Sequence, residues 1–478
     1  QGRLVEAVSL IERGLGVLEA ERMAGVRTSL AQARKSGHDR QADTYEQAAA
    51  AVSRLLVVDA ATNSGDLLDT TSDVIAARRG EQLALAMADL ITARQALETA
   101  LGRPLLPEGT LAEVATAATT GAPVVYLLAT HVGGAALTIH PDAHVTITWL
   151  DTLTTPRVQD WAATLTDLHP DTGGTGDAGR TDTRRGGMID DENPSTGVVV
   201  RGPGGEPDPD TVAGLLAELA TVLTPLTSLG QHLRLVPVGA LARLPIPAAL
   251  LDTETTASLA PSARLHALAE TAAAAHETAE PVRVAAVTNP TPCTGWPALP
   301  AAAAEGSWLH ETYHAEHVTG PDATRDAVLT LLAGTHTAIH LAVHGHTDHD
   351  HPDHTALLLT DTPDGHPDTL TLADLTDQPT PGQVRLVMLN ACWLAHPAHT
   401  LPDEALAFPT VLLETTTAAV IAPLWPVDDT AAYTFTRAFY TSWQAGHPPT
   451  TALAHAQTLT RHLHPHTPTW AAYTLTGS

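Results

Sequence analysis

Two short segments in the C-terminal half end in side chains suited to nucleophilic catalysis. One is an apolar run that ends in His344-Gly345, and the other ends in Ala391-Cys392. A free thiol has a pKa of about 8.5 and is mostly protonated at neutral pH, so a nucleophilic cysteine needs a neighbouring base. We therefore interpret Cys392 as a candidate nucleophile and His344 as its candidate general base. Cys392 lies 48 positions after His344, close to the roughly 50 that separate His and Cys in one class of cysteine peptidases.

Gly345 adds a further element to this pair. It has no Cβ, so a substrate can approach the backbone closely. Its N–H and that of Cys392 are candidate donors for an oxyanion hole, which would stabilise the tetrahedral intermediate of acyl transfer. A cysteine or histidine at a strand end is usually structural when taken alone. Together on one edge of a sheet, at this spacing, they favour the functional interpretation.

A dense run of polar residues after His344 offers a rival chemistry. Its side chains are of the types that bind metal ions: His344, His346, Asp348, His349, Asp350, His351, Asp353 and His354. The run is loop-like and has no helical i, i+4 pair, and the chain is rich in histidine, with 26 in all. We therefore predict no metal site and no cofactor, with a metal-dependent hydrolase as the open alternative.

Composition limits the classes of partner. The chain has 478 residues, of which 53 are acidic and 25 basic, for a net charge of −28. Nucleic acids and anionic membranes require a basic face, so we expect neither as a partner. No uninterrupted apolar run reaches the ~18 residues of a membrane span. The two cysteines predict no disulfide framework, and Cys293 is expected to have no function. Without a signal-peptide pattern or an initiator Met, the chain is expected to be cytoplasmic and a fragment or processed product.

Three regions are expected along the chain. Residues 1–105 have apolar side chains at helical spacing and predict a helical adaptor, the end of a possible repeat array. Residues 106–230 begin with strands near 124–128, 135–139 and 144–149, which predict a β-hairpin region. Residues 170–210 are rich in Gly, Asp, Thr, Arg and Pro, which predicts a flexible loop. Residues 231–478 form the expected catalytic core.

The catalytic core alternates predicted helices and strands. Such alternation is typical of an α/β fold with a mostly parallel sheet that is flanked by helices. Ligands of these sheets bind beyond the carboxyl ends of the strands. Strands are predicted at 337–343 and 384–389, so His344 and Cys392 both follow a strand end. The topology therefore predicts that they lie on the same edge of the sheet.

The last ~250 residues resemble the CHAT domain, a caspase-like branch of the clan of cysteine peptidases that includes caspases and separase. The resemblance rests on these stretches: Leu244-Pro245, Ala248-Ala249-Leu250, Asn289-Pro290, His340-Leu341-Ala342, His344-Gly345, Leu357-Leu358-Leu359, Val387 to Cys392, Ala422, Leu424 to Asp429, Phe439-Tyr440 and Trp470 to Tyr473. The helical N-terminus, with Glu6-Ala7-Val8 and Glu12-Arg13-Gly14, is similar to the segment that joins tetratricopeptide repeats to this domain in actinobacterial proteins. The resemblance implies a caspase-like sheet, with His344 as general base and Cys392 as nucleophile.

Asp428 and Asp429 follow a predicted strand that ends in Trp425-Pro426. In caspase-like folds the loop at this point lines the pocket for the residue before the scissile bond, and a carboxylate there would favour a basic side chain. The alternative is a helix N-cap, in which one of these carboxylates accepts free N–H groups of the helix that follows. Both interpretations stay open.

These observations predict a cysteine endopeptidase that cleaves protein substrates through a Cys–His dyad. Control by an upstream helical repeat region or a regulatory protein partner is expected, because an unrestrained cytoplasmic protease is harmful. The alternative is a catalytically silent caspase-like scaffold or signalling module.

Overall fold

The computed structural model describes most of the catalytic core and part of the N-terminal region. The described residues are 2–15, 30, 32–60, 70–102, 122–166, 205–276, 282–346, 355–376, 384–391, 407–415 and 417–478. Cys392 lies outside them, as do residues 347–354 of the His-Asp run and residues 170–204 of the predicted loop.

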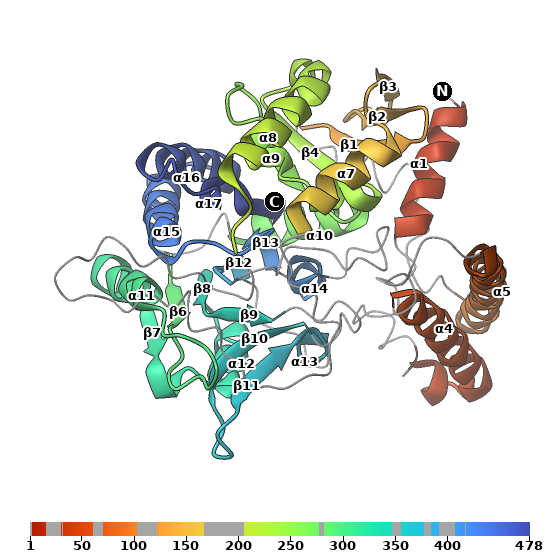
Figure 1. Cartoon of the computed structure of the whole chain (residues 1–478). Coiled ribbons are helices and arrows are strands. Elements are labelled where there is room, and N and C mark those ends of the chain that lie inside the picture. Colours follow the sequence, from red (N-terminus) through yellow and green to blue (C-terminus); the bar gives the residue numbers. More distant parts are fainter. Residues whose placement is uncertain are drawn as a thin grey trace.

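An 11-stranded sheet forms the centre of the molecule (Figure 1), with strand order β3-β2-β1-β4-β5-β14-β13-β12-β8-β6-β7. Its strands are β1 (Val124–Thr130), β2 (Gly133–Ile139), β3 (Val145–Leu150), β4 (His232–Pro237), β5 (Thr256–Leu259), β6 (Val284–Thr288), β7 (Glu316–Thr319), β8 (Ala338–Ala342), β12 (Val384–Leu389), β13 (Thr417–Pro423) and β14 (Tyr473–Gly477). Only the pairs β1–β2, β2–β3 and β13–β14 are antiparallel. The predicted mostly parallel α/β sheet is therefore confirmed.

The single antiparallel pair within the core, β13–β14, divides the sheet into two blocks of opposite direction. β6, β7, β8, β12 and β13 run one way, and β1, β4, β5 and β14 run the other. The carboxyl ends of β8 and β12 therefore share one edge of the sheet, and those of β4 and β5 lie at the opposite edge. All residues of β8 and β13 are buried, as expected for strands that are covered on both faces.

Helices cover both faces of this sheet. α11 (Pro300–Tyr313), α15 (Asp429–Gln444) and α16 (Pro449–Leu463) pack together on one face (Figure 1). α10 (Ala263–His276) and α14 (Phe408–Glu414) pack on β13 and on each other. The remaining core helices are α7 (Thr155–Thr166), α8 (Pro209–Leu223), α9 (Ile246–Ala249), α12 (Arg325–Leu332), α13 (Leu372–Thr376), α17 (Thr469–Ala472) and the 3-10 turns η1 (Thr224–Leu229), η2 (Gly239–Arg243) and η3 (Gly320–Asp322).

A small second sheet begins where β8 ends. It contains β9 (His344–His346), β10 (Ala356–Asp361) and β11 (Pro367–Thr371), in the order β11-β10-β9 with antiparallel pairing. Only Val343 separates β8 from β9. The chain therefore leaves the central sheet directly before His344.

The expected β-hairpin region extends the central sheet. β1, β2 and β3 form an antiparallel meander, and β1 pairs in parallel with β4. In the N-terminal region, α1 (Gly2–Leu15) packs Val8 and Leu15 into one apolar cluster with Tyr126 of β1 and Ile139 of β2. α4 (Asp39–Ala60) and α5 (Thr70–Leu101) pack against each other instead.

One helical stretch bears on the expected absence of a membrane span. Within the described residues, Pro209–Leu229 is long and apolar enough to cross a membrane by composition, with a mean hydropathy of 1.6. Six apolar residues of its helix α8, Val212, Leu215, Leu216, Leu219, Val222 and Leu223, are buried in the main core. Its apolar character is therefore used in packing.

Candidate active site

The carboxyl ends of β8 and β12 closely precede the two members of the candidate dyad in the sequence. The two strands are neighbours, with Leu341 of β8 level with Leu389 of β12. The N–H of Asn390 continues this register by donating to the carbonyl of Leu341 at 2.7 Å. His344 follows Leu341 by three residues, and Cys392 follows Leu389 by three residues. The predicted strand ends therefore do lie side by side, although Cys392 itself is outside the described residues.

The imidazole of His344 is held in one orientation. Its side chain is buried, and Nε2 lies 2.8 Å from the carbonyl oxygen of Pro297. A carbonyl oxygen can only accept, so Nε2 carries the hydrogen of the neutral ring and Nδ1 carries the lone pair. The indole of Trp296 packs beside the imidazole, with 4.8 Å between ring centroids. The contact with Pro297 therefore fixes which nitrogen of the neutral His344 ring is the donor.

The loop between β6 and α11 carries both residues that hold His344. It is anchored near its start by Asn289, whose N–H donates to the carbonyl of Ala342 at 3.0 Å. The side-chain oxygen of Asn289 also accepts from the N–H of Leu299 at 2.7 Å, which closes the loop. In between, the Asp361 carboxylate accepts from the N–H of Thr294 at 2.8 Å. These contacts fix the Pro297 carbonyl relative to the end of β8.

Gly345, the candidate oxyanion residue, lies in β9. It is level with Leu357 of β10 in an antiparallel ladder. In such a ladder, successive residue pairs alternate between exchanging hydrogen bonds with each other and facing away. The oxyanion function that we predict requires the N–H of Gly345 to face away from β10.

The carboxylates of Asp428 and Asp429 both contact helix N-termini. Asp428 is the N-cap of α15 and accepts from the N–H of Ala431 at 2.7 Å. Asp429 reaches across to α11, where it accepts from the N–H of Ala301 at 2.8 Å. Both side chains are buried. The capping alternative thus has the geometry it requires, and pocket specificity stays a prediction.

A half-buried carboxylate, Glu206, lies next to Asp428. Glu206 accepts from the hydroxyls of Thr467 and Thr469 and from the N–H of Asp428. Burial raises the pKa of Glu206 above its ordinary value, and the nearby charge of Asp428 raises it further, against the lowering effect of the two hydroxyl donors. Glu206 therefore anchors the described end of the predicted loop to the start of α15.

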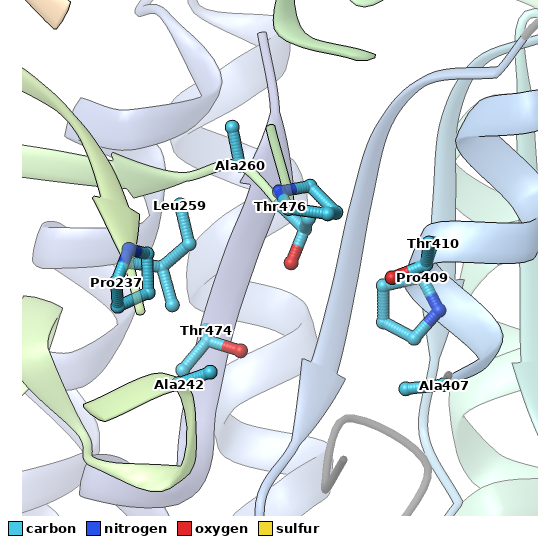
Figure 2. Close-up of a pocket in the computed structure, with 10 residues that line it drawn as sticks. Pro237, Ala242, Leu259, Ala260, Ala407, Pro409, Thr410, Thr474 and Thr476 are labelled. Atoms are coloured by element: carbon cyan, nitrogen blue, oxygen red, sulfur yellow. The ribbon is translucent and has the colours of Figure 1, made fainter. Parts of the chain in front are cut away.

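A pocket in the described part of the chain lies elsewhere. Figure 2 shows Thr474 and Thr476 of β14 between residues of β4 and β5 on one side and residues of α14 on the other. Its lining is Pro237, Ala242, Leu259, Ala260, Pro261, Ala407, Pro409, Thr410, Thr474 and Thr476. None of the predicted site residues belongs to it, and this mainly apolar lining carries no group suited to the predicted chemistry.

Among the described residues no group of three or more His, Cys, Asp or Glu side chains is placed to hold a metal ion. Of the His-Asp run, only His344 and His346 are described, so the rival metal chemistry stays untested. Cys293 is buried, and burial together with the charge of Asp361 raises the pKa of its thiol to about 11. A thiol of this kind is a poor nucleophile.

Sequence reasoning did not identify Trp296 or Pro297. The only signal was a Trp-Pro pair in an otherwise polar loop, far from His344 in sequence. It also missed Glu305, a fully buried carboxylate of α11. The sequence gives little indication that Glu305 is buried, because an acidic residue in a helix is usually exposed.

Comparisons with known proteins agree with the predicted family. The sequence model of the CHAT domain matches residues 213–478, whereas a search of curated protein sequences finds no match. Separase in the separase–securin complex of Saccharomyces cerevisiae is similar over 77% of this chain and 31% of its own chain, with 11% identity and a TM-score of 0.48. The Arg-specific cysteine proteinase gingipain R is similar over 56% of this chain and 67% of its own, with 10% identity and a TM-score of 0.38. The complex of the Porphyromonas gingivalis RgpB pro- and mature domains is similar over 56% of this chain and 69% of its own chain, with 10% identity and a TM-score of 0.38.

This chain thus spans about a third of the separase chain that it resembles. The family match covers more than half of the 478 residues and includes β8, β12 and the two candidate residues that follow them. The chain therefore belongs to the CHAT domain family.

Proposed function

We propose that this chain is a cysteine endopeptidase in which Cys392 attacks the scissile carbonyl and His344 acts as general base and then as general acid. The observation that carries the proposal is the hydrogen bond from Nε2 of His344 to the carbonyl of Pro297. It selects the tautomer whose Nδ1 can take a thiol proton, and its acceptor stabilises the imidazolium that then forms.

The strand register supports the same pair. Leu341 and Leu389 are level, and the two candidate residues follow them at equal distances along the chain. Family membership is the second support, because His344-Gly345 and Ala391-Cys392 lie within the matched residues. Neither depends on the low-identity structural likenesses.

The proposed reaction proceeds in two halves. Nδ1 of His344 takes the thiol proton of Cys392, and the thiolate attacks the carbonyl carbon of the peptide bond. The N–H groups of Gly345 and Cys392 stabilise the resulting oxyanion. The His344 imidazolium then donates its proton to the leaving amine, which leaves a thioester on Cys392. A water molecule, deprotonated by His344, hydrolyses this thioester and restores the free thiol.

We also propose that the N-terminal helix α1 transmits control from an upstream repeat region or a protein partner. The buried carboxylate of Glu12 in α1 accepts from the hydroxyl of Tyr126 at 2.6 Å and from the N–H of Arg264 at 3.0 Å. Arg264 lies in the first turn of α10, which packs on β12 and β13. A displacement of α1 would therefore act on a helix that contacts the strand before Cys392.

The function is tested with a thiol-reactive peptide probe and a library of peptide substrates. We expect Cys392→Ala and His344→Ala each to abolish turnover while the circular dichroism spectrum is unchanged. Cys293→Ala is the matched control, because it removes the other cysteine, which is buried and has a raised pKa. Undiminished turnover in either dyad variant would refute the dyad. Turnover that persists in Cys392→Ala and is lost with a chelator would favour the metal-dependent alternative.

A protein with no turnover and no labelling of Cys392 by the peptide probe would instead be a silent scaffold. The assay is therefore run on the full chain, with and without the upstream region, so that a resting state can be distinguished from an inactive site. Cleavage of library peptides also measures the preference at the residue before the scissile bond.

A further inference from the structure

A polar cluster is buried beneath the two strand ends. Its centre is Glu305 of α11, whose Oε2 atom lies 2.7 Å from Nε2 of His340, 2.9 Å from Nδ2 of Asn390 and 3.1 Å from the hydroxyl of Thr436. The hydroxyl of Tyr473 donates to Oδ1 of Asn390. All five side chains are fully buried. They come from five different elements, α11, β8, β14, α15 and the residue that follows β12.

The hydrogen-bond directions in this cluster are mutually consistent. Tyr473 donates to Oδ1 of Asn390, so the amide of Asn390 faces Glu305 and donates to it. A carboxylate only accepts, so Nε2 of His340 carries a hydrogen. Among the described atoms, Nδ1 of His340 has no hydrogen-bond partner.

A carboxylate in such a place is costly unless several donors contact it. Removing an ionised group from water without compensation costs several kcal/mol. Here at least three donors converge on one oxygen of Glu305, which offsets this cost. Apolar side chains of similar shape in place of the whole cluster would pack the helix on the sheet without that requirement, so packing alone does not explain why a buried polar cluster is present here.

The cluster joins the residues that precede both members of the dyad. Asn390 is two residues before Cys392, and His340 is four residues before His344. Glu305 connects their side chains through one oxygen atom, while the N–H of Asn390 holds the backbone of Leu341. A change in the position of either strand end would break a hydrogen bond in a site that water cannot reach.

We infer that Glu305 is a positioning residue for the proposed peptidase site. It fixes the chain that leads into Cys392 relative to the chain that leads into His344, and so sets the distance and direction between thiol and imidazole. The inference rests on the proposed function for its catalytic consequence. The expected effect of Glu305 on the reactivity of the Cys392 thiol does not depend on peptidase activity.

The first test is Glu305→Gln, with Glu311→Gln as matched control, because Glu311 is exposed on the same helix. In Glu305→Gln the amide oxygen can take the place of Oε2, but a neutral oxygen accepts from the three donors less strongly than a carboxylate does, so the hold on the Asn390 side chain is weakened. We expect kcat to fall ~10–100-fold with KM within about twofold, as for small misplacements of reacting groups. The pH profile of Cys392 alkylation, followed at that residue by mass spectrometry, should move to higher pH. A merely structural function would lower the unfolding temperature and leave this profile unchanged.

The second variant, Tyr473→Phe, keeps the test decisive if Glu305→Gln does not fold. The ring of Tyr473 is stacked on Phe435 at 3.8 Å between centroids, and phenylalanine keeps that packing. It removes only the hydroxyl that donates to Asn390. We expect the same direction of change, and a double variant whose effect is smaller than the sum of the two, since both act through Asn390.

The outcomes separate this inference from the proposed function. Additive effects, or a Cys392 alkylation profile that matches the unmodified chain in Glu305→Gln and in Tyr473→Phe, would overturn the positioning inference whatever the turnover. An unmodified chain without turnover, whose Cys392 alkylates as an ordinary free thiol, would overturn the proposed function. If the variants shift the pH profile of Cys392 alkylation but the unmodified chain has no turnover, the positioning inference stands and the proposed function does not.

Discussion

The carbonyl oxygen of Pro297 lies 2.8 Å from Nε2 of His344, although the two residues are 47 positions apart in the sequence. The contact exists because the loop after β6 is tied to the end of β8 through Asn289 and Ala342. The orientation of the proposed base is therefore determined by a different segment from the one that carries it. This arrangement places the tautomer of His344 under the control of backbone geometry, which a side-chain substitution near the site leaves largely intact.

Trp296 should contribute to this orientation through its ring. Its indole covers the imidazole of His344 at 4.8 Å, so Trp296→Ala would let the ring turn away from the Pro297 carbonyl and admit water. We expect kcat to fall about tenfold or more, since misplaced catalytic groups lose rate steeply. Steady-state kinetics measure this effect. Trp149→Ala is the control, because Trp149 is 68% exposed on β3, and equal losses in both variants would contradict a specific function of Trp296.

Asp429 distinguishes capping from substrate specificity. Its carboxylate accepts from the N–H of Ala301 at the start of α11, so Asp429→Ala should lower the free energy of unfolding by about 1 kcal/mol through the lost cap. We expect cleavage after Arg and after Leu to fall to the same extent. Peptide pairs that differ only at this position measure the ratio. A selective loss of cleavage after Arg would establish the pocket function instead, and Asp208→Ala, which removes the exposed N-cap of α8, controls for a cap lost elsewhere.

Much of the fold follows from local sequence patterns. The strands that precede His344 and Cys392 are continuous apolar runs, and such runs predict buried parallel strands wherever helices alternate with them. The strands predicted at 337–343 and 384–389 lie at β8 and β12. The predicted strands at 124–128 and 135–139 lie within β1 and β2. Their continuity with the core sheet depends on the β1–β4 pairing, which no local pattern encodes.

The contacts that surround His344 could not be predicted in the same way. The Pro297 carbonyl is a backbone group, and nothing in its sequence neighbourhood indicates which side chain it meets. Glu305 is typical of a surface helix position until three donors from other elements are placed around it. The pair Asp428 and Asp429 illustrates a third case, in which the sequence predicts two alternatives and the long-range contact from Asp429 to Ala301 makes the capping geometry visible.

Glu12 should couple helix α1 to strand β1 and to the start of helix α10. Its carboxylate contacts Tyr126 and the start of α10, and burial with the adjacent charge raises the pKa of Tyr126 well above its ordinary value. Glu12→Ala leaves the Tyr126 hydroxyl and the Arg264 N–H without this acceptor, which costs ~1–3 kcal/mol in stability. We expect α1 to become more sensitive to proteolysis and its amides to exchange faster. Glu6→Ala is the control, since Glu6 is exposed on the same helix, and unchanged exchange in α1 of Glu12→Ala would contradict the coupling.

His232 makes the stability of the core depend on pH. It is packed beside Thr256, Ser258, Arg234, Glu270 and His266, and contacts the first two at 3.2 and 3.4 Å. Burial, and secondarily the charge of Arg234, lowers its pKa from 6.5 to about 4. Between these two pKa values the unfolded chain binds a proton at His232 that the folded chain does not. The contribution of His232 to the free energy of unfolding is therefore fully present above pH ~6.5 and is lost as the pH falls toward ~4. The pKa of His266 is also lowered by burial, which adds a contribution of the same sign.

Each such histidine changes the free energy of unfolding by up to about 1.4 kcal/mol per pH unit in this range. We therefore expect His232→Gln to flatten, without abolishing, the decrease in unfolding free energy between pH 6.5 and 4, because His266 remains. Urea unfolding at a series of pH values measures the slope. His447→Gln, at an exposed position, should retain the full slope of the unmodified chain. An identical slope in His232→Gln would mean that His232 titrates alike in the folded and unfolded chains, and that the acid sensitivity of the core arises from other groups.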